Sequence, residues 1–192
     1  MNDLFEQWKS SYKELKHVKT ITSCAMFGAL AVILGYFSIQ IGEFLKIGFS
    51  SIPNEIVAYL FGPVVAPCFG AVMDILKYMI KPTGAFFPGF TITAIVAGLI
   101  NGMLLYRKRV QFVRVIITQF IVIVVCDIVL NTFWLSILYG KGFMVILPIR
   151  IIKNLIMWPI ESIILFIILK TLHGALEIRN FHSMKEREGI EQ

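Results

Sequence analysis

The stretch from Leu130 to Asn154, LNTFWLSILYGKGFMVILPIRIIKN, sets aromatic, amide and basic residues into an otherwise apolar sequence. A polar residue inside a bilayer-spanning segment is costly, at about 2.5–3.5 kcal/mol for Arg or Lys near a helix centre. Several such residues close together indicate a pocket for a flat, hydrogen-bonding, anionic molecule. They are Asn131, Trp134, Tyr139, Lys141, Arg150, Lys153 and Asn154.

Some of these residues have a simpler interpretation as anchors at the membrane surface. Trp and Tyr favour the level of the lipid headgroups, and Arg and Lys can extend their charged ends to water. We favour anchoring for Tyr139 and Lys141, which flank a Gly-Lys-Gly turn. Asn131, Arg150 and Asn154 lie a turn or more inside the expected helices, and for these we favour the pocket.

Composition places the chain in a membrane. Of its 192 residues, 57% are hydrophobic and 16% are charged, which excludes an ordinary soluble domain. At about 20 residues for each span, this length allows about six helices with short loops. The net charge of +6 is therefore first a matter of membrane topology, and we expect no nucleic acid partner.

Motifs for catalysis and metal binding are missing from the sequence. Cys24, Cys68 and Cys126 each stand alone in an apolar run, without a CxxC motif or a Cys/His cluster. There is no Walker A loop, no HExxH motif and no candidate Ser/His/Asp set. We therefore expect no catalytic residue, no metal site and no cofactor.

Apolar runs separated by Gly- and Pro-rich turns predict an all-α membrane protein, a six-transmembrane-helix bundle within residues 21–172. Residues 1–20 carry apolar side chains three and four apart, which predicts a cytoplasmic amphipathic helix on the membrane surface; a frayed tail is the alternative. Residues 173–192 form a polar cytoplasmic tail, which we expect to be frayed. The expected helices cover residues 21–41, 52–62, 66–80, 88–106, 113–138 and 144–172.

The basic residues predict the orientation of this bundle. With six spans, one side receives twelve of the eighteen Lys and Arg residues, so both termini are expected to be cytoplasmic. The remaining six gather at the outward side, which suggests an anionic ligand that arrives from outside. These six are Lys46, Lys77, Lys81, Lys141, Arg150 and Lys153.

Other residues allow two interpretations. Ala25 and Ala29 are four apart and make a groove that admits another helix, either from this chain or from a partner. Glu55 lies in the first turn of a predicted helix, where the helix dipole favours an acid. Asp74 and Asp127 can bind ligand or pair with buried basic residues, and Asp74 is three residues from Lys77.

The segment PNEIVAYLFGPVVAPCFGAVMDILKYMIKPTGAFFPGFTITAIVAGLINGMLLY resembles the substrate-binding S components of energy-coupling factor (ECF) vitamin transporters. The likeness rests on the Phe-Gly-Pro turn, on Gly70 and Asp74 four residues apart, and on FFPGFT at the start of the fourth helix. The stretch from Leu130 to Asn154 is most similar to folate-specific members of that family.

The resemblance implies a six-helix bundle in the plasma membrane of a bacterium, with a vitamin pocket near the outer side. The loop of residues 41–51 would gate that pocket. Ala25 and Ala29 would face a membrane-embedded coupling (T) protein, which joins two ABC ATPases. The implied function is high-affinity capture of folate or reduced folates outside, followed by ATP-driven delivery inward.

For a folate, the residue types suggest how the flat pteridine ring could be held. Trp134, Phe86 or Phe90 could stack on the ring. Asn131 and Asn154 could pair with its donor and acceptor edge.

The glutamate tail of a folate calls for basic groups. Arg150 could bind one carboxylate with two hydrogen bonds, and Lys153 or Lys77 could supply a second charge. Arg150, Lys153 and Asn154 are three and four apart and so share one helix face. The same scaffold could serve riboflavin or thiamine instead. Another class of protein, a small channel or an intramembrane enzyme, lacks the polar stripe or the nucleophile and base that it would need.

Overall fold

The computed structural model describes the backbone of residues 2–41, 45–82 and 86–190, and the side chains of residues 6–38, 48–82 and 86–175. Within these described residues, five segments are long and apolar enough to cross a membrane, so the predicted class of a helical membrane protein is confirmed. They are Val18–Tyr36, Ile52–Ile80, Pro88–Leu105, Phe112–Tyr139 and Phe143–Ala175.

The helices α1 (Asn2–Glu14) and α2 (Val18–Tyr36) precede a short hairpin of β1 (Ile39–Ile41) and β2 (Leu45–Ile47). The two strands are antiparallel, with Ile39 opposite Ile47. Helix α2 ends at Tyr36, just before the hairpin. The first membrane helix was predicted to end five residues later, at residue 41. The hairpin occupies part of the predicted gate loop, of which residues 42–44 lie outside the described residues.

Helix α3 (Ile52–Ile80) folds back on itself at Gly62. Gly62 has φ 86° and ψ −167°, a conformation that favours glycine, and Pro63 follows it. The Nζ atom of Lys77 lies 2.8 Å from the carbonyl oxygen of Ser50. The ends of a straight helix of 29 residues would be about 43 Å apart. Residues 52–61 and 63–80 are therefore two antiparallel limbs, and the predicted turn at Gly62-Pro63 is confirmed.

Small residues let α4 (Pro88–Leu105) approach the second limb of α3 closely. A Cβ atom at Gly98 would lie 2.8 Å from the backbone of Ala66, and one at Gly102 would lie 2.6 Å from Cα of Pro63. Substitution at either glycine would therefore force the two backbones apart. Gly98 and Gly102 thus pack within the chain.

The segment predicted as one helix over residues 113–138 is continuous but not regular. It consists of α5 (Phe112–Val122), a π-helix η1 (Ile123–Asn131) and α6 (Thr132–Tyr139). π-Helices are rare and occur frequently at functional sites. The wider turn changes which side chains of this segment face the same way, and the sequence did not predict it.

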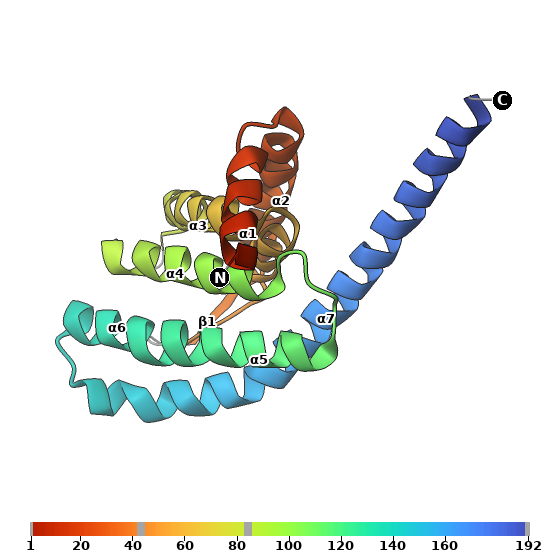
Figure 1. Ribbon diagram of the computed structural model, residues 1–192. Helices are drawn as coiled ribbons and strands as arrows, with labels where there is room; N and C mark the ends of the chain where they lie inside the picture. Colours follow the sequence, from red (N-terminus) through yellow and green to blue (C-terminus); the bar gives the residue numbers. More distant parts are fainter. Residues whose placement is uncertain (1, 42–44, 83–85, 191–192) are drawn as a thin grey trace.

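Helix α7 (Phe143–Ile190) starts where the sixth helix was predicted and continues far beyond residue 172. The prediction of a frayed tail is therefore wrong for the backbone up to Ile190. Figure 1 shows that the first part of α7 lies beside α5 and α6, whereas its last part projects away from the other helices. Pro148 and Pro159 lie inside α7, where each removes a backbone hydrogen bond.

Helix α1 packs on α3 through polar side chains. Ser11 is fully buried, and its hydroxyl donates to the carbonyl of Phe61 at 2.5 Å and accepts from the N–H of Val64 at 3.0 Å. The hydroxyl therefore satisfies backbone groups that the break at Gly62 releases. The aromatic side chains of α1 point the other way, with Trp8 41% and Tyr12 56% exposed.

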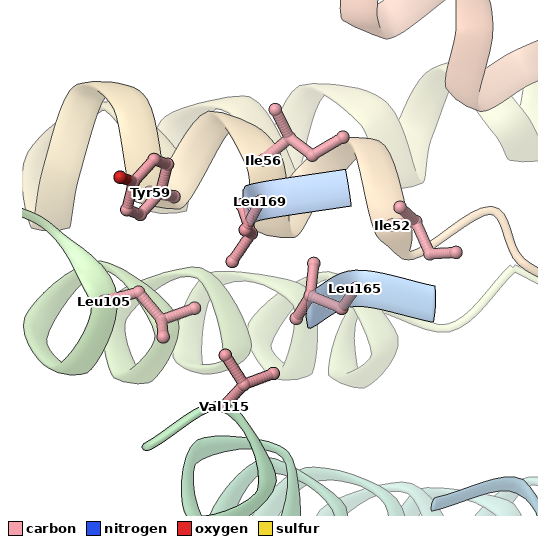
Figure 2. Close-up of a cluster of buried hydrophobic side chains, with 7 residues drawn as sticks. All are labelled: Ile52, Ile56, Tyr59, Leu105, Val115, Leu165 and Leu169. Carbon is pink, nitrogen blue, oxygen red and sulfur yellow. The ribbon is translucent and has the colours of Figure 1, made fainter. Parts of the chain in front are cut away.

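One apolar cluster joins α3, α4, α5 and α7 (Figure 2). Its side chains come from the first limb of α3, the end of α4, the first turn of α5 and the middle of α7, so it joins four elements of the bundle. Its members are Ile52, Ile56, Tyr59, Leu105, Val115, Leu165 and Leu169.

Candidate binding site

A cavity of about 450 Å³ lies among α3, α4, α5, η1, α6 and α7. Its size is that of pockets that bind small organic molecules. Seven of the eight residues that the sequence indicated as ligand contacts line it. These are Lys77, Phe86, Phe90, Asn131, Arg150, Lys153 and Asn154.

Trp134, the eighth of these residues, packs behind the cavity wall. Its indole N–H donates to Oγ1 of Thr93 at 3.2 Å, and its ring lies 5.6 Å from the ring of Phe87. Both Thr93 and Phe87 line the cavity. Trp134 therefore supports an aromatic wall, and its direct stacking on a ligand stays a prediction. Phe87, which the sequence interpretation did not single out, supplies a wall ring in its place.

Arg150 and Asp127 form an ion pair at the cavity surface. Nη2 of Arg150 lies 3.5 Å from Oδ1 of Asp127, and Arg150 is 7% exposed. Nδ2 of Asn131 donates to the same oxygen at 3.1 Å. The interpretation of Asp127 as the partner of a buried basic residue is therefore confirmed. The pair holds a guanidinium group inside a largely apolar bundle, where it can meet an anionic ligand.

Two lysines lie where the cavity meets the ends of α2 and α3. Nζ of Lys81 donates to the carbonyls of Tyr36 at 3.2 Å and Ser38 at 3.4 Å, while Lys77 donates to Ser50. Both lysines therefore connect the helices to the segment that carries the hairpin. We call this end of the cavity, with Lys77, Lys81 and Arg150, the basic end. Nearby, Oδ2 of Asp74 accepts a hydrogen bond from Thr91 at 2.7 Å.

The cavity is also lined by polar groups that the sequence interpretation largely missed. Buried polar atoms of five of its residues make no hydrogen bond with any part of the chain that the structure describes. Glu161 also lines the cavity. We call this set the polar floor. The five residues are Asn54, Glu55, Asn101, Gln119 and Asn154.

The structure changes the interpretation of Glu55 more than that of any other residue discussed above. Glu55 was attributed to the helix dipole, yet it is only 5% exposed and lines the cavity close to Gln119 and Glu161. The signal that could have found it is the cost of a polar residue in a membrane helix, which applies equally to Asn101 and Gln119. Of these floor residues, the sequence interpretation singled out only Asn154 for the pocket.

The polar groups around the cavity can bind a ligand but have no evident catalytic arrangement. Within the described residues, no group of three His, Cys, Asp or Glu side chains could hold a metal ion. The cations and acceptors that line the cavity suit a ligand that carries both carboxylates and N–H donors.

The outer face of α2 is a separate feature. Ala25 and Ala29 are exposed, whereas Gly28 and Ala31 are buried on the face that meets α3. A Cβ atom at Gly28 would lie 3.1 Å from Sδ of Met73. Internal packing of α2 therefore uses Gly28 and Ala31 and leaves the Ala25–Ala29 groove open.

Comparisons with known proteins agree with this architecture. The model of the family described as ECF transporter, substrate-specific component, matches residues 19–169. The folate transporter FolT of Clostridium novyi (strain NT) is 38% identical over 153 residues, which cover 79% of this chain and 88% of that protein. The folate transporter FolT of Leuconostoc mesenteroides is 30% identical, over 71% of this chain and 77% of that protein.

A solved structure extends the similarity to three dimensions. The crystal structure of FolT bound with folic acid matches with a TM-score of 0.71 and 34% identity, and the match covers 78% of this chain and 92% of that one. The S component of another bacterial ECF transporter matches with a TM-score of 0.56 at 22% identity, which supports the fold alone.

Proposed function

The chain belongs to the substrate-specific components of ECF transporters, and from this premise we propose that it is the folate-binding membrane subunit of such an importer. In this role it captures folate or reduced folates outside the cell. An ATP-driven module then completes delivery to the cytoplasm.

One observation carries the choice of folate: a cavity that joins aromatic walls to a basic end, in a chain similar to folate transporters. A pteridine is flat, so Phe86 or Phe90 can stack on it in the cavity. Arg150 lines the cavity and can bind a tail carboxylate, and Lys77 or Lys153 can supply a second charge. Thiamine is cationic and riboflavin is uncharged, so neither would use the basic end.

The proposal includes six membrane-crossing segments with both termini in the cytoplasm. The two limbs of α3 support the count, because the chain reverses at Gly62. The excess of basic residues near the termini and the α4–α5 connection supports the orientation. Cysteines introduced at Lys108 and Lys141, both exposed, test it with a membrane-impermeant thiol reagent. We expect Lys141 to label from outside and Lys108 only after permeabilisation; the reverse pattern contradicts the orientation.

We further propose that the exposed groove at Ala25 and Ala29 is where the membrane-embedded T protein docks, itself joined to two ABC ATPases. Small residues on a lipid-facing helix allow close approach of another helix. The exposure of both alanines supports docking over internal packing.

A fluorescence titration tests the ligand. Phe87 lines the cavity and contacts Trp134, so a pteridine ring in the cavity should quench the emission of Trp134, with Trp8 and Trp158 as background. We expect saturable quenching of the detergent-purified protein by folic acid, and weaker binding of pteroate, which lacks the glutamate. A response to riboflavin or thiamine but not to folic acid would keep the family and overturn the choice of folate.

A further inference from the structure

Helix α1 packs on α3 with a single face, and its other side chains are aromatic and basic groups that remain exposed. We propose that α1 and the α4–α5 connection together form a binding surface for the headgroups of anionic phospholipids. This surface is separate from the cavity, and the inference does not depend on which vitamin the cavity binds.

Helix α1 lies at the level where several membrane segments begin, reverse or end. The hydroxyl of Ser11 bonds to backbone groups at the break of α3, and Oγ of Ser10 lies 3.1 Å from the hydroxyl of Tyr106, the first residue after α4. Helix α2 starts at Val18, soon after α1 ends. These apolar segments leave the hydrocarbon layer beside α1, so the helix lies at the depth of the lipid headgroups.

The side chains of α1 divide it into distinct faces. Gln7 and Ser11 are buried against the rest of the chain. Trp8 and Tyr12 are four residues apart and so share a neighbouring face, which is exposed. Nζ of Lys16 lies 5.4 Å from the centroid of the Tyr12 ring, so positive charge borders this face. Trp and Tyr favour the headgroup level of a membrane, and lipid is therefore the natural cover for the aromatic face.

Positive charge dominates this part of the chain. Residues 6–19 and 107–114 hold eight Lys and Arg residues but only two acidic residues, Glu6 and Glu14. Glu14 accepts a hydrogen bond from Thr20 at 3.0 Å. The basic side chains on α1, just after it and in the α4–α5 connection are exposed, and none forms a salt bridge with an acidic group among the described side chains. We call this set the α1 basic surface: Lys9, Lys13, Lys16, Arg107, Lys108 and Arg109.

Tyr106 holds the two parts of the α1 basic surface together. Its ring is only 3% exposed, its hydroxyl meets Ser10 on α1, and the guanidinium carbon of Arg107 lies 5.3 Å from its ring centroid. Lys9 is adjacent to Ser10, and Arg107 is adjacent to Tyr106. Cations from two different elements therefore flank one contact, where they can share a phosphate group.

An anionic phospholipid satisfies both the charged and the aromatic parts of this surface. Its phosphate accepts hydrogen bonds from Lys and Arg, while its acyl chains can cover Trp8 and Tyr12. A soluble anion would leave the aromatic face uncovered. In the proposed orientation the surface faces the cytoplasmic leaflet, whose negative surface potential attracts basic segments.

Quenching of Trp8 by brominated lipids tests the proposal on the full chain in detergent micelles. Bromine on the acyl chains quenches an indole only at close approach, and the difference from the Trp8→Phe variant separates Trp8 from Trp134 and Trp158. We expect brominated phosphatidylglycerol to half-quench Trp8 at a mole fraction on the order of ten-fold lower than brominated phosphatidylcholine. Equal quenching by the two lipids overturns the anionic site. Quenching by neither also overturns it, and leaves the surface to an acidic partner protein.

Charge-matched variants locate the binding surface. Lys9→Gln with Arg107→Gln removes one cation from each element, so we expect the preference for phosphatidylglycerol to fall below about two-fold. Lys170→Gln with Lys185→Gln removes the same charge from α7 and should keep the preference. A preference that survives in the first pair overturns the site. An equal loss in both pairs overturns it as well, because the response would then follow net charge alone.

A second pair keeps the test valid if the first pair does not fold, as judged by size-exclusion chromatography. Lys13→Gln with Lys108→Gln leaves the contact between Arg107 and Tyr106 in place, and we expect the same loss of preference. The result is also distinct from that for the vitamin. A folded protein that prefers phosphatidylglycerol but does not bind folic acid overturns the proposed function and leaves the lipid surface intact.

Discussion

The side chains around the cavity are polar and buried, whereas those on the outer face of α2 are small or apolar and exposed. Gln119 is 1% and Asn154 3% exposed, but Met26 on α2 is 71% exposed and Ala25 and Ala29 lie beside it. Buried polar atoms can recognise a small polar molecule, and a face of small apolar residues can only offer close packing in lipid. The proposed binding site and the proposed docking site therefore occupy different surfaces, and substitutions should affect them separately.

The largest expected effect is on the α2 face. The double substitution Ala25→Leu and Ala29→Leu fills the groove, so we expect folate uptake by cells that hold the complete transporter to be lost. The affinity of the purified subunit for folic acid should stay within about two-fold, because neither alanine lines the cavity. Met26→Leu, on the same exposed helix, is the control. Loss of binding in the double variant would show that this face packs internally.

The next effect is at the basic end. Arg150→Ala removes the partner of Asp127 and leaves that carboxylate uncompensated where the ligand's own carboxylates arrive. Removing one member of a buried charge pair costs about 2–5 kcal/mol, so we expect folic acid affinity to fall on the order of 100-fold. Isothermal titration calorimetry measures this loss. Arg150→Lys should recover part of it, and an unchanged Kd for Arg150→Ala would remove Arg150 from the site.

Arg150, Lys153 and Asn131 could be predicted from the sequence as residues that line the cavity, because they are conspicuous in an apolar stretch. The turn at Gly62 could be predicted as well, since Gly-Pro allows no regular helix. These features depend on local residue types. They do not depend on how distant parts of the chain pack.

The floor could not be predicted in the same way. Asn101 and Gln119 are single polar residues in long apolar runs, and only the packing of several helices determines that they face one cavity. The π-helix η1 has no pattern in the sequence that distinguishes it from an α-helix. The buried face of α1 is polar because the break at Gly62 needs hydrogen bonds from Ser11, which is a contact between distant parts of the chain.

The prediction for the C-terminal tail failed for a different reason. We equated polarity with fraying, but Leu, Glu, Lys and Arg are good helix formers, so a polar segment can extend an existing helix without burying anything. Helix nucleation is the costly step, and α7 is already formed when the tail begins.

The smallest effect is expected at Ser11, which lies on neither surface. Ser11→Ala leaves the N–H of Val64 without its hydroxyl partner at the break in α3, and a buried donor left unsatisfied costs about 1–3 kcal/mol. We expect a lower Tm in a detergent thermal-shift measurement, with folic acid affinity and uptake nearly unchanged at temperatures where the protein is folded. Ser10→Ala, which removes one contact to the hydroxyl of Tyr106, should lower the Tm less. A variant that is less stable but still binds and transports would show that lost stability alone does not explain the lost uptake of the Ala25 and Ala29 double variant or the lost affinity of Arg150→Ala. If Ser11→Ala instead weakened binding as much as Arg150→Ala, the angle between the limbs of α3 would itself determine the shape of the cavity, and binding would not be confined to the residues that line it.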